Sequence, residues 1–236
     1  MGRWREAPEG LPKGPPGDGA ARLTYLKSMS IAHGHRVLAA GEPVGSARAA
    51  MILLHGRGAS AEDVMTIASE VHQPGWAYLA PQASGGAWYP NPFTAPLESN
   101  EPYLSAGLDM ISKLVDRVEP TVPAQRIVLL GFSQGACLTL EWAARNARRY
   151  GAVAGLSGGL IGPEGTPRDY PGSFDQTPVF LGCSDVDPYI KKERVLDAAD
   201  VFKRMGGDVT VRLYPGMGHT VGPEEIAIVR GLVEAI

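Results

Sequence analysis

The chain has 236 residues, of which 44% are hydrophobic and 20% charged, with a formal net charge of -3. This composition is typical of a globular domain with a sizeable buried core, so it excludes a largely disordered chain. The balance of charges leaves no excess of Lys and Arg to neutralise phosphates, which excludes nucleic acid as a favoured partner.

Two further features bear on the compartment. No run approaches the roughly 20 apolar residues that a membrane span requires, so we expect no stable membrane insertion. The two cysteines, Cys137 and Cys183, each lie inside an apolar run, where a reduced core thiol is more common than a disulfide. We therefore expect a cytoplasmic protein.

The first part of the chain is rich in proline and glycine, with prolines at positions 8, 12, 15 and 16. Such a segment can neither hold a helix nor donate a full ladder of sheet hydrogen bonds, so we predict that residues 1–28 form a flexible extension. Met29 is a candidate natural start, a hypothesis that the intact mass of the native protein tests. We predict that residues 29–236 form a single domain.

From Arg36 onward, short apolar runs alternate with longer amphipathic stretches, which is the pattern of a βαβ architecture. Several runs are continuously apolar, as expected for strands covered by helices on both faces, so we predict a mostly parallel central sheet. The chain is too short to add a separate lid domain. The predicted elements in chain order are strand 36–40, strand 50–55, helix 61–71, strand 76–80, helix 102–118, strand 126–131, helix 135–149, strand 152–156, strand 178–183, helix 191–205, strand 209–214 and helix 223–235.

The strongest functional signal is a G-x-S-x-G motif at residues 131–135, between a predicted strand and a predicted helix. A serine nucleophile needs a sharp strand-to-helix turn, and the flanking glycines let strand and helix approach closely. Ser133 is therefore the candidate nucleophile of an α/β-hydrolase fold. The following helix directs free N–H groups toward a developing oxyanion, so the Gln134 N–H is one expected donor.

A serine hydroxyl becomes a good nucleophile when a histidine, oriented by a carboxylate, accepts its proton. In this fold the acid and then the histidine follow the serine, and His219 is the only histidine after Ser133. Asp185 and Asp187 both follow a predicted strand end, and spacing does not choose between them. Pro188 biases Asp187 toward an extended conformation, which favours Asp187 as the acid and leaves Asp185 to cap the turn.

The second oxyanion donor is expected from the loop after an earlier strand. Gly56 and Arg57 directly follow predicted strand 50–55, which makes the Arg57 N–H the expected donor, although glycines here also fit an ordinary turn. We expect His55 to orient this loop. The chemistry needs no metal and no organic cofactor, and we predict no metal site.

Together these motifs resemble the phospholipase/carboxylesterase family of α/β hydrolases, which includes bacterial carboxylesterases and acyl-protein thioesterases. The resemblance spans about residues 36–236 and is carried by segments 54–58, 87–90, 131–135, 185–188 and 216–219. It implies that Asp187 is the acid, that Arg57 and Gln134 supply the oxyanion donors, and that Trp88 lies beside the active site. Arg57 replaces a small apolar residue of the acyl-protein thioesterases, which weakens any transfer of protein depalmitoylation.

We predict a serine carboxylesterase that hydrolyses short- to medium-chain esters through an acyl-enzyme on Ser133, with a small-molecule ester as its partner. Trp88, Tyr89 and Phe93 indicate an aromatic cleft, in which Gly56, Trp88 and Tyr89 contact the substrate. The alternatives are an acyl thioesterase or lysophospholipase and, less favoured, a non-catalytic binding protein on the same fold. The sequence is compatible with a homodimer as well as with a monomer.

Overall fold

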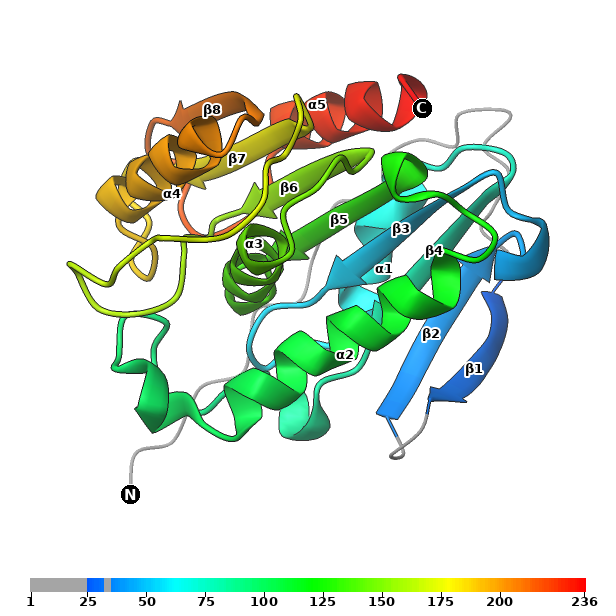
Figure 1. Cartoon of the computed structure of the whole chain (residues 1–236), viewed down its shortest axis with the longest axis horizontal. Coiled ribbons are helices and arrows are strands. Elements are labelled where there is room, and N and C mark those ends of the chain that lie inside the picture. The colour runs from blue at the N-terminus through cyan, green and yellow to red at the C-terminus, as the bar shows by residue number, and fades with distance from the viewer. Residues whose placement is uncertain (1–24, 32–34) are drawn as a thin grey trace.

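The structure is a computed structural model that describes residues 25–31 and 35–236. Within this part of the chain, eight strands form one sheet in the order β1-β2-β4-β3-β5-β6-β7-β8 (Figure 1). The strands are β1 (Tyr25–Ile31), β2 (His35–Gly41), β3 (Ala49–Leu54), β4 (Trp76–Pro81), β5 (Ile127–Phe132), β6 (Ala152–Leu156), β7 (Pro178–Ser184) and β8 (Asp208–Tyr214). The α-helices are α1 (Ala61–Glu70), α2 (Tyr103–Val118), α3 (Gln134–Arg145), α4 (Lys192–Arg204) and α5 (Pro223–Glu234), and the short 3-10 helices are η1 (Val44–Ser46), η2 (Ser84–Gly86), η3 (Leu97–Asn100) and η4 (Ala124–Arg126).

The sheet is mostly parallel, as predicted. Strand β2 pairs antiparallel with β1 and with β4, and the neighbouring strands from β4 to β8 pair in parallel. Every residue of β3, β4 and β6 is buried, because helices cover both faces of the sheet. Helices α2, α3 and α4 pack on one face and α1 and α5 on the other, which gives two apolar layers (Figure 1).

The predicted elements are all present, and their ends agree to within one residue except at the end of α3. That helix ends at Arg145, four residues before the predicted end. Beyond it the chain turns so that the Tyr150 N–H donates to Thr177 Oγ1 at 2.9 Å, a contact across the fold that helical spacing does not reveal. None of the described helices is long and apolar enough to span a membrane.

Strand β1 is an addition to the predicted elements. It begins at Tyr25, so residues 25–28, which we assigned to the extension, belong to a strand that pairs with β2. The stretch YLKSMSI mixes polar and apolar residues, and β2 offers it an edge for pairing. The prediction for residues 1–24 lies outside the described part of the chain.

The topology brings several loops to one edge of the sheet. Strands β3, β5, β7 and β8 run parallel, so their carboxyl ends lie on the same side. The segments that follow these ends contain residues 55–59, Ser133, 185–190 and 215–222. This edge is where open α/β sheets bind their ligands, and it carries the residues that sequence analysis assigned to the active site.

Candidate active site

Ser133 lies on a strained turn between the end of β5 and the start of α3. Its backbone has φ 55° and ψ -120°, in a region that residues other than glycine rarely adopt. A Cβ on Gly131 would lie 2.3 Å from the Gly135 carbonyl oxygen, and one on Gly135 would lie 2.3 Å from the Leu54 carbonyl oxygen. Only glycine fits at both positions, so the motif forms the sharp turn that an exposed serine nucleophile requires.

The structure brings the three predicted residues Ser133, His219 and Asp187 into one chain of hydrogen bonds. His219 Nε2 lies 2.8 Å from Ser133 Oγ, and His219 Nδ1 lies 2.7 Å from Asp187 Oδ2. With a neutral imidazole, Nδ1–H donates to the carboxylate and Nε2 accepts from the serine hydroxyl. The geometry is that of a nucleophile, a base and an orienting acid.

The Asp187 carboxylate is fully buried and held by several donors. Besides His219, the N–H groups of Tyr189 and Ile190 donate to Oδ1 at 2.9 and 3.0 Å. Burial alone would raise the pKa of Asp187, but the hydrogen bonds from His219 and from these two N–H groups outweigh it and hold the pKa below its ordinary value. The carboxylate is therefore charged and fixed in position at neutral pH.

Asp185, the other candidate acid, has a different place. Its Oδ1 accepts the Gly216 N–H at 2.8 Å, and the neighbouring Ser184 Oγ accepts the Gly218 N–H at 3.2 Å. These contacts tie the loop that carries His219 to the end of β7. Asp185 thus fixes the histidine loop, and Asp187 contacts the histidine itself.

Two aromatic rings that sequence analysis did not assign flank His219. The ring of Phe132 lies 5.0 Å from the imidazole, and the edge-on ring of Tyr189 lies 4.9 Å from it. Phe132 directly precedes the candidate nucleophile, and Tyr189 follows Asp187 by two residues. Their proximity in sequence to the motif residues was the available signal. Together they restrict the orientation of the imidazole.

The turn after β3 is adjacent to the nucleophile. A Cβ on Gly56 would lie 3.3 Å from Ser133 Cβ, so this glycine allows the turn to approach. His55 is buried, with Nδ1 2.7 Å from the Gly56 carbonyl oxygen and Nε2 accepting the Ala83 N–H at 3.0 Å. Burial lowers the pKa of His55 despite the bond to Gly56, so the ring is neutral at neutral pH and orients the turn, as predicted.

The side chains of Arg57 and Gln134 both hold the segment 88–91. The Arg57 guanidinium donates to the carbonyl oxygens of residues 89–91 at 2.8 to 3.0 Å. Gln134 accepts the Trp88 N–H through Oε1 at 2.9 Å and donates through Nε2 to the Tyr89 carbonyl oxygen at 2.8 Å. The two residues predicted to stabilise an oxyanion through their backbones therefore also fix a neighbouring segment through their side chains.

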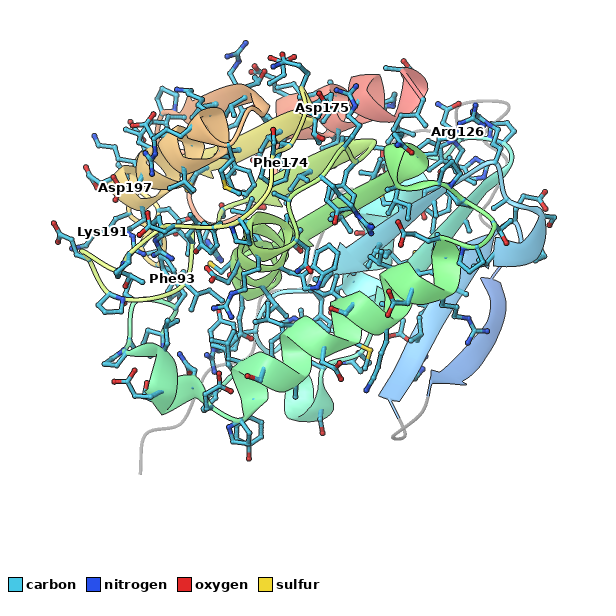
Figure 2. All side chains as sticks on the ribbon, in the orientation of Figure 1. Phe93, Arg126, Phe174, Asp175, Lys191 and Asp197 are labelled. Carbon is cyan, nitrogen blue, oxygen red and sulfur yellow. The ribbon has the colours of Figure 1, made fainter. Side chains whose placement is uncertain are left out.

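The structure places the aromatic side chains of this region elsewhere than the expected cleft wall. Trp88, Tyr89 and Phe93 are only 6%, 1% and 8% exposed and belong to the core. The Trp88 indole donates to the His55 carbonyl oxygen at 2.9 Å, and the Arg194 guanidinium lies 5.1 Å from the Phe93 ring. Figure 2 shows Phe93 beside the loop that joins β6 to β7. We therefore correct the assignment of Trp88 and Tyr89: these side chains support the site from the core.

An open groove instead lies beside His219, between α1 and the segment 219–221. It has a volume of about 330 Å³, and Gly56 is the one predicted substrate-contacting residue in its lining. The apolar residues that line it, and that sequence analysis did not assign, are Ala59, Val64, Ile67, Phe132 and Val221. The available signal was the pair of apolar residues one helical turn apart on α1, directly after the Gly56 turn.

The sheet is mostly parallel, and a serine lies on a strained turn between a strand and a helix. This serine is hydrogen-bonded to a histidine, which in turn is hydrogen-bonded to a carboxylate. These features define the class of serine α/β hydrolases. The sequence pattern of the phospholipase/carboxylesterase family matches residues 35–235. The chain belongs to this family.

Individual relatives agree with this membership. A crystal structure of a phospholipase/carboxylesterase from Dyadobacter fermentans is 38% identical, covers 88% of this chain and all of that one, and superposes with a TM-score of 0.82. Acyl-protein thioesterase 1 of Neurospora crassa is 31% identical over 65% of this chain and 61% of its own length. That of Gibberella zeae is 36% identical over 46% of this chain and 47% of its own length. The matches therefore span less than two thirds of these thioesterases.

Proposed function

We propose that the protein is a serine carboxylesterase that hydrolyses short- to medium-chain carboxylic esters through an acyl-enzyme on Ser133. The observation that carries this proposal is the hydrogen-bond chain from Ser133 through His219 to Asp187. The family membership and the strained serine turn support it independently. A cytoplasmic location is part of the proposal, and the two buried free cysteines support a reducing compartment.

The mechanism has two halves. His219 accepts the Ser133 proton as Oγ attacks the ester carbonyl carbon, and the backbone N–H groups of Arg57 and Gln134 stabilise the oxyanion. His219 then gives the proton to the leaving alcohol, which breaks the ester bond and leaves the acyl group on Ser133. Water, deprotonated by His219, attacks the acyl carbon; His219 then returns the proton to Ser133 Oγ as the bond to the acyl group breaks, which releases the acid. Asp187 holds the imidazole in the required tautomer throughout.

Thioester hydrolysis is the second candidate, because the curated relatives named above are acyl-protein thioesterases. The same serine, histidine and oxyanion donors would perform it, since only the leaving atom changes from oxygen to sulfur. Comparing an ester and a thioester with the same acyl group and the same leaving-group carbon skeleton separates the two activities.

The direct test is hydrolysis of p-nitrophenyl acetate and p-nitrophenyl butyrate by the parent protein and by Ser133→Ala. Removal of a serine nucleophile is expected to lower kcat by roughly 10⁴-fold or more. Ser69→Ala, at an exposed serine on α1, serves as the matched control and should keep parental activity. Circular dichroism checks the fold of each variant. Parental turnover by Ser133→Ala, or no turnover by the parent protein, would contradict the proposed function.

A further inference from the structure

The groove between α1 and the segment 219–221, called here the α1 groove, is continuous with the catalytic histidine. Its lining includes His219, the following residue pair, and Phe132, whose ring packs 5.0 Å from the imidazole. Val64 and Ile67 of α1 form the opposite wall. At about 330 Å³ it is large enough for a small organic group.

The chemistry of the proposed mechanism decides which part of an ester occupies this side. The leaving oxygen must receive its proton from His219 Nε2, the atom that lies 2.8 Å from Ser133 Oγ. The alcohol part of the ester therefore lies against His219, while the acyl part stays bonded to Ser133. A groove lined by His219 and the two residues after it lies on the alcohol side.

The charges in the α1 groove restrict the alcohol further. Among the described residues that line it, Asp63 carries a carboxylate and none is Lys or Arg. The Asp63 carboxylate accepts the Ser60 N–H at 2.7 Å and the Ser60 hydroxyl at 2.8 Å, which fixes it as part of the α1 capping box. The apolar lining favours an apolar group, and the nearby negative charge disfavours an anion.

We propose that the α1 groove binds the leaving alcohol of the substrate and selects uncharged apolar alcohols over leaving groups that carry phosphate. This assignment rests on the proposed function, because it uses the proton transfer from His219. It makes esters of aromatic or short aliphatic alcohols the favoured substrates. Acyl-CoA and lysophospholipids, whose leaving groups carry phosphate, are disfavoured.

The test varies the alcohol at a constant acyl group and then the acyl group at a constant alcohol. Ethyl butyrate and benzyl butyrate form the first series, and ethyl acetate, ethyl butyrate and ethyl hexanoate form the second. All butyrates give the same acyl-enzyme, so a difference between them in kcat/KM reports the acylation step and the contacts of the alcohol. Butyryl-CoA and S-benzyl thiobutyrate compare a phosphate-bearing with an apolar leaving group on the same acyl group.

Thr66→Trp fills the α1 groove from the exposed surface of α1, and Ser69→Trp places the same ring on this helix outside the groove. Thr66→Trp should lower kcat/KM for benzyl butyrate by about tenfold, since the filled groove can no longer bury the apolar benzyl group. Ethyl butyrate should change by less than about twofold, and the ratios within the acyl series should stay as in the parent. Ser69→Trp should match the parent throughout.

Val221→Ser provides a second variant that keeps the groove open but makes it polar. It should lower the benzyl-to-ethyl ratio by about fivefold without changing the acyl series. A change in the acyl ratios with unchanged alcohol ratios in either variant would show that the groove binds the acyl chain, and would overturn the assignment. So would butyryl-CoA hydrolysis as fast as that of S-benzyl thiobutyrate. Turnover by Ser133→Ala would instead overturn the proposed function itself.

Discussion

The nucleophile turn, residues 131–135, and the segment 88–91 lie near each other but are held by different kinds of contact. In the turn, the backbone itself decides the geometry, because Gly131 and Gly135 leave no room for a Cβ and Ser133 has a positive φ. The segment 88–91 is held by the side chains of Arg57 and Gln134, which are 32 to 46 residues away in sequence.

The two kinds of contact should respond differently to substitution. A contact between two backbones cannot relax when an atom is added between them, so the nucleophile turn should tolerate almost no change. A segment held by several side-chain hydrogen bonds can lose some of them and keep its place, with a moderate loss of stability. We therefore expect large effects at the triad and the turn and smaller effects at the supporting side chains.

The largest effect is expected at the triad, where two neighbouring aspartates have different contacts. Asp187→Asn should lower kcat by about 10⁴-fold, because an amide no longer holds His219 in the required tautomer. Asp185→Asn keeps an acceptor for the Gly216 N–H and should cost less than about tenfold. Steady-state rates with p-nitrophenyl butyrate measure both. Equal losses in the two variants would contradict the assignment of Asp187 as the acid.

The next largest effect is expected in the turn itself. Gly131→Ala introduces a Cβ 2.3 Å from the Gly135 carbonyl oxygen and should lower the free energy of unfolding by about 3 kcal/mol or more, with loss of activity. Gly231→Ala on α5 is the matched control, because a Cβ there meets nothing within 4 Å. It should raise the free energy of unfolding by up to about 1 kcal/mol. Urea unfolding compares them, and a stable, active Gly131→Ala would refute the close approach of strand and helix.

A buried carboxyl group holds the end of the loop that carries His219, where this loop meets α5. Glu225 is fully buried and accepts the Gly222 N–H at 2.8 Å. Burial raises the pKa of Glu225 from 4.5 to about 7 against this hydrogen bond, and the charge of Glu224 adds to the rise. Because the folded protein binds this proton more tightly than the unfolded chain, the stability it contributes is complete below pH 4.5 and is lost as the pH rises through about 7.

Glu225→Gln should remove this pH dependence, since the amide does not titrate. Between pH 5 and pH 8 the parent should lose about 2 kcal/mol of unfolding free energy that the variant does not lose. The exposed Glu234→Gln serves as the control and should follow the parental curve. Urea unfolding at the two pH values measures the difference, and parallel curves for Glu225→Gln and the parent would contradict the raised pKa.

The smallest effect is expected at the side chains that hold the segment 88–91. Arg57→Met removes the hydrogen bonds to three carbonyl oxygens and should lower the unfolding free energy by about 1 kcal/mol and kcat/KM by about fivefold, through displacement of the Arg57 N–H. Arg212→Met removes an exposed arginine paired at 3.9 Å with Glu224 and should change stability by less than about 0.5 kcal/mol. Matching losses in the two variants would show that the contacts with residues 89–91 contribute nothing.

Most of the fold could be predicted because its signals are local. Strands such as β3 are continuous apolar runs, and their burial on both faces follows from that pattern. Strand β1 could not be predicted this way, because its polar and apolar residues give a weak pattern and it forms by pairing with the edge of β2.

The same distinction applies to the site. Ser133, Asp187 and His219 each follow a strand end within a recognisable motif, so their meeting could be predicted. The burial of Trp88 and Tyr89 could not, because it depends on hydrogen bonds from residues distant in sequence. The α1 groove was also missed, because it exists only where α1 and the segment after His219 meet in space.

In the proposed mechanism, Ser133 is the activated nucleophile of the site. The most direct measurement is labelling of the folded protein with a fluorophosphonate probe, followed by digestion and mass spectrometry to locate the modified residue. We expect the label on Ser133 and none on the folded Ser133→Ala variant, because only a serine activated by an adjacent base reacts readily. A label on another residue, or a folded parent protein that takes up no label, would contradict this role of Ser133.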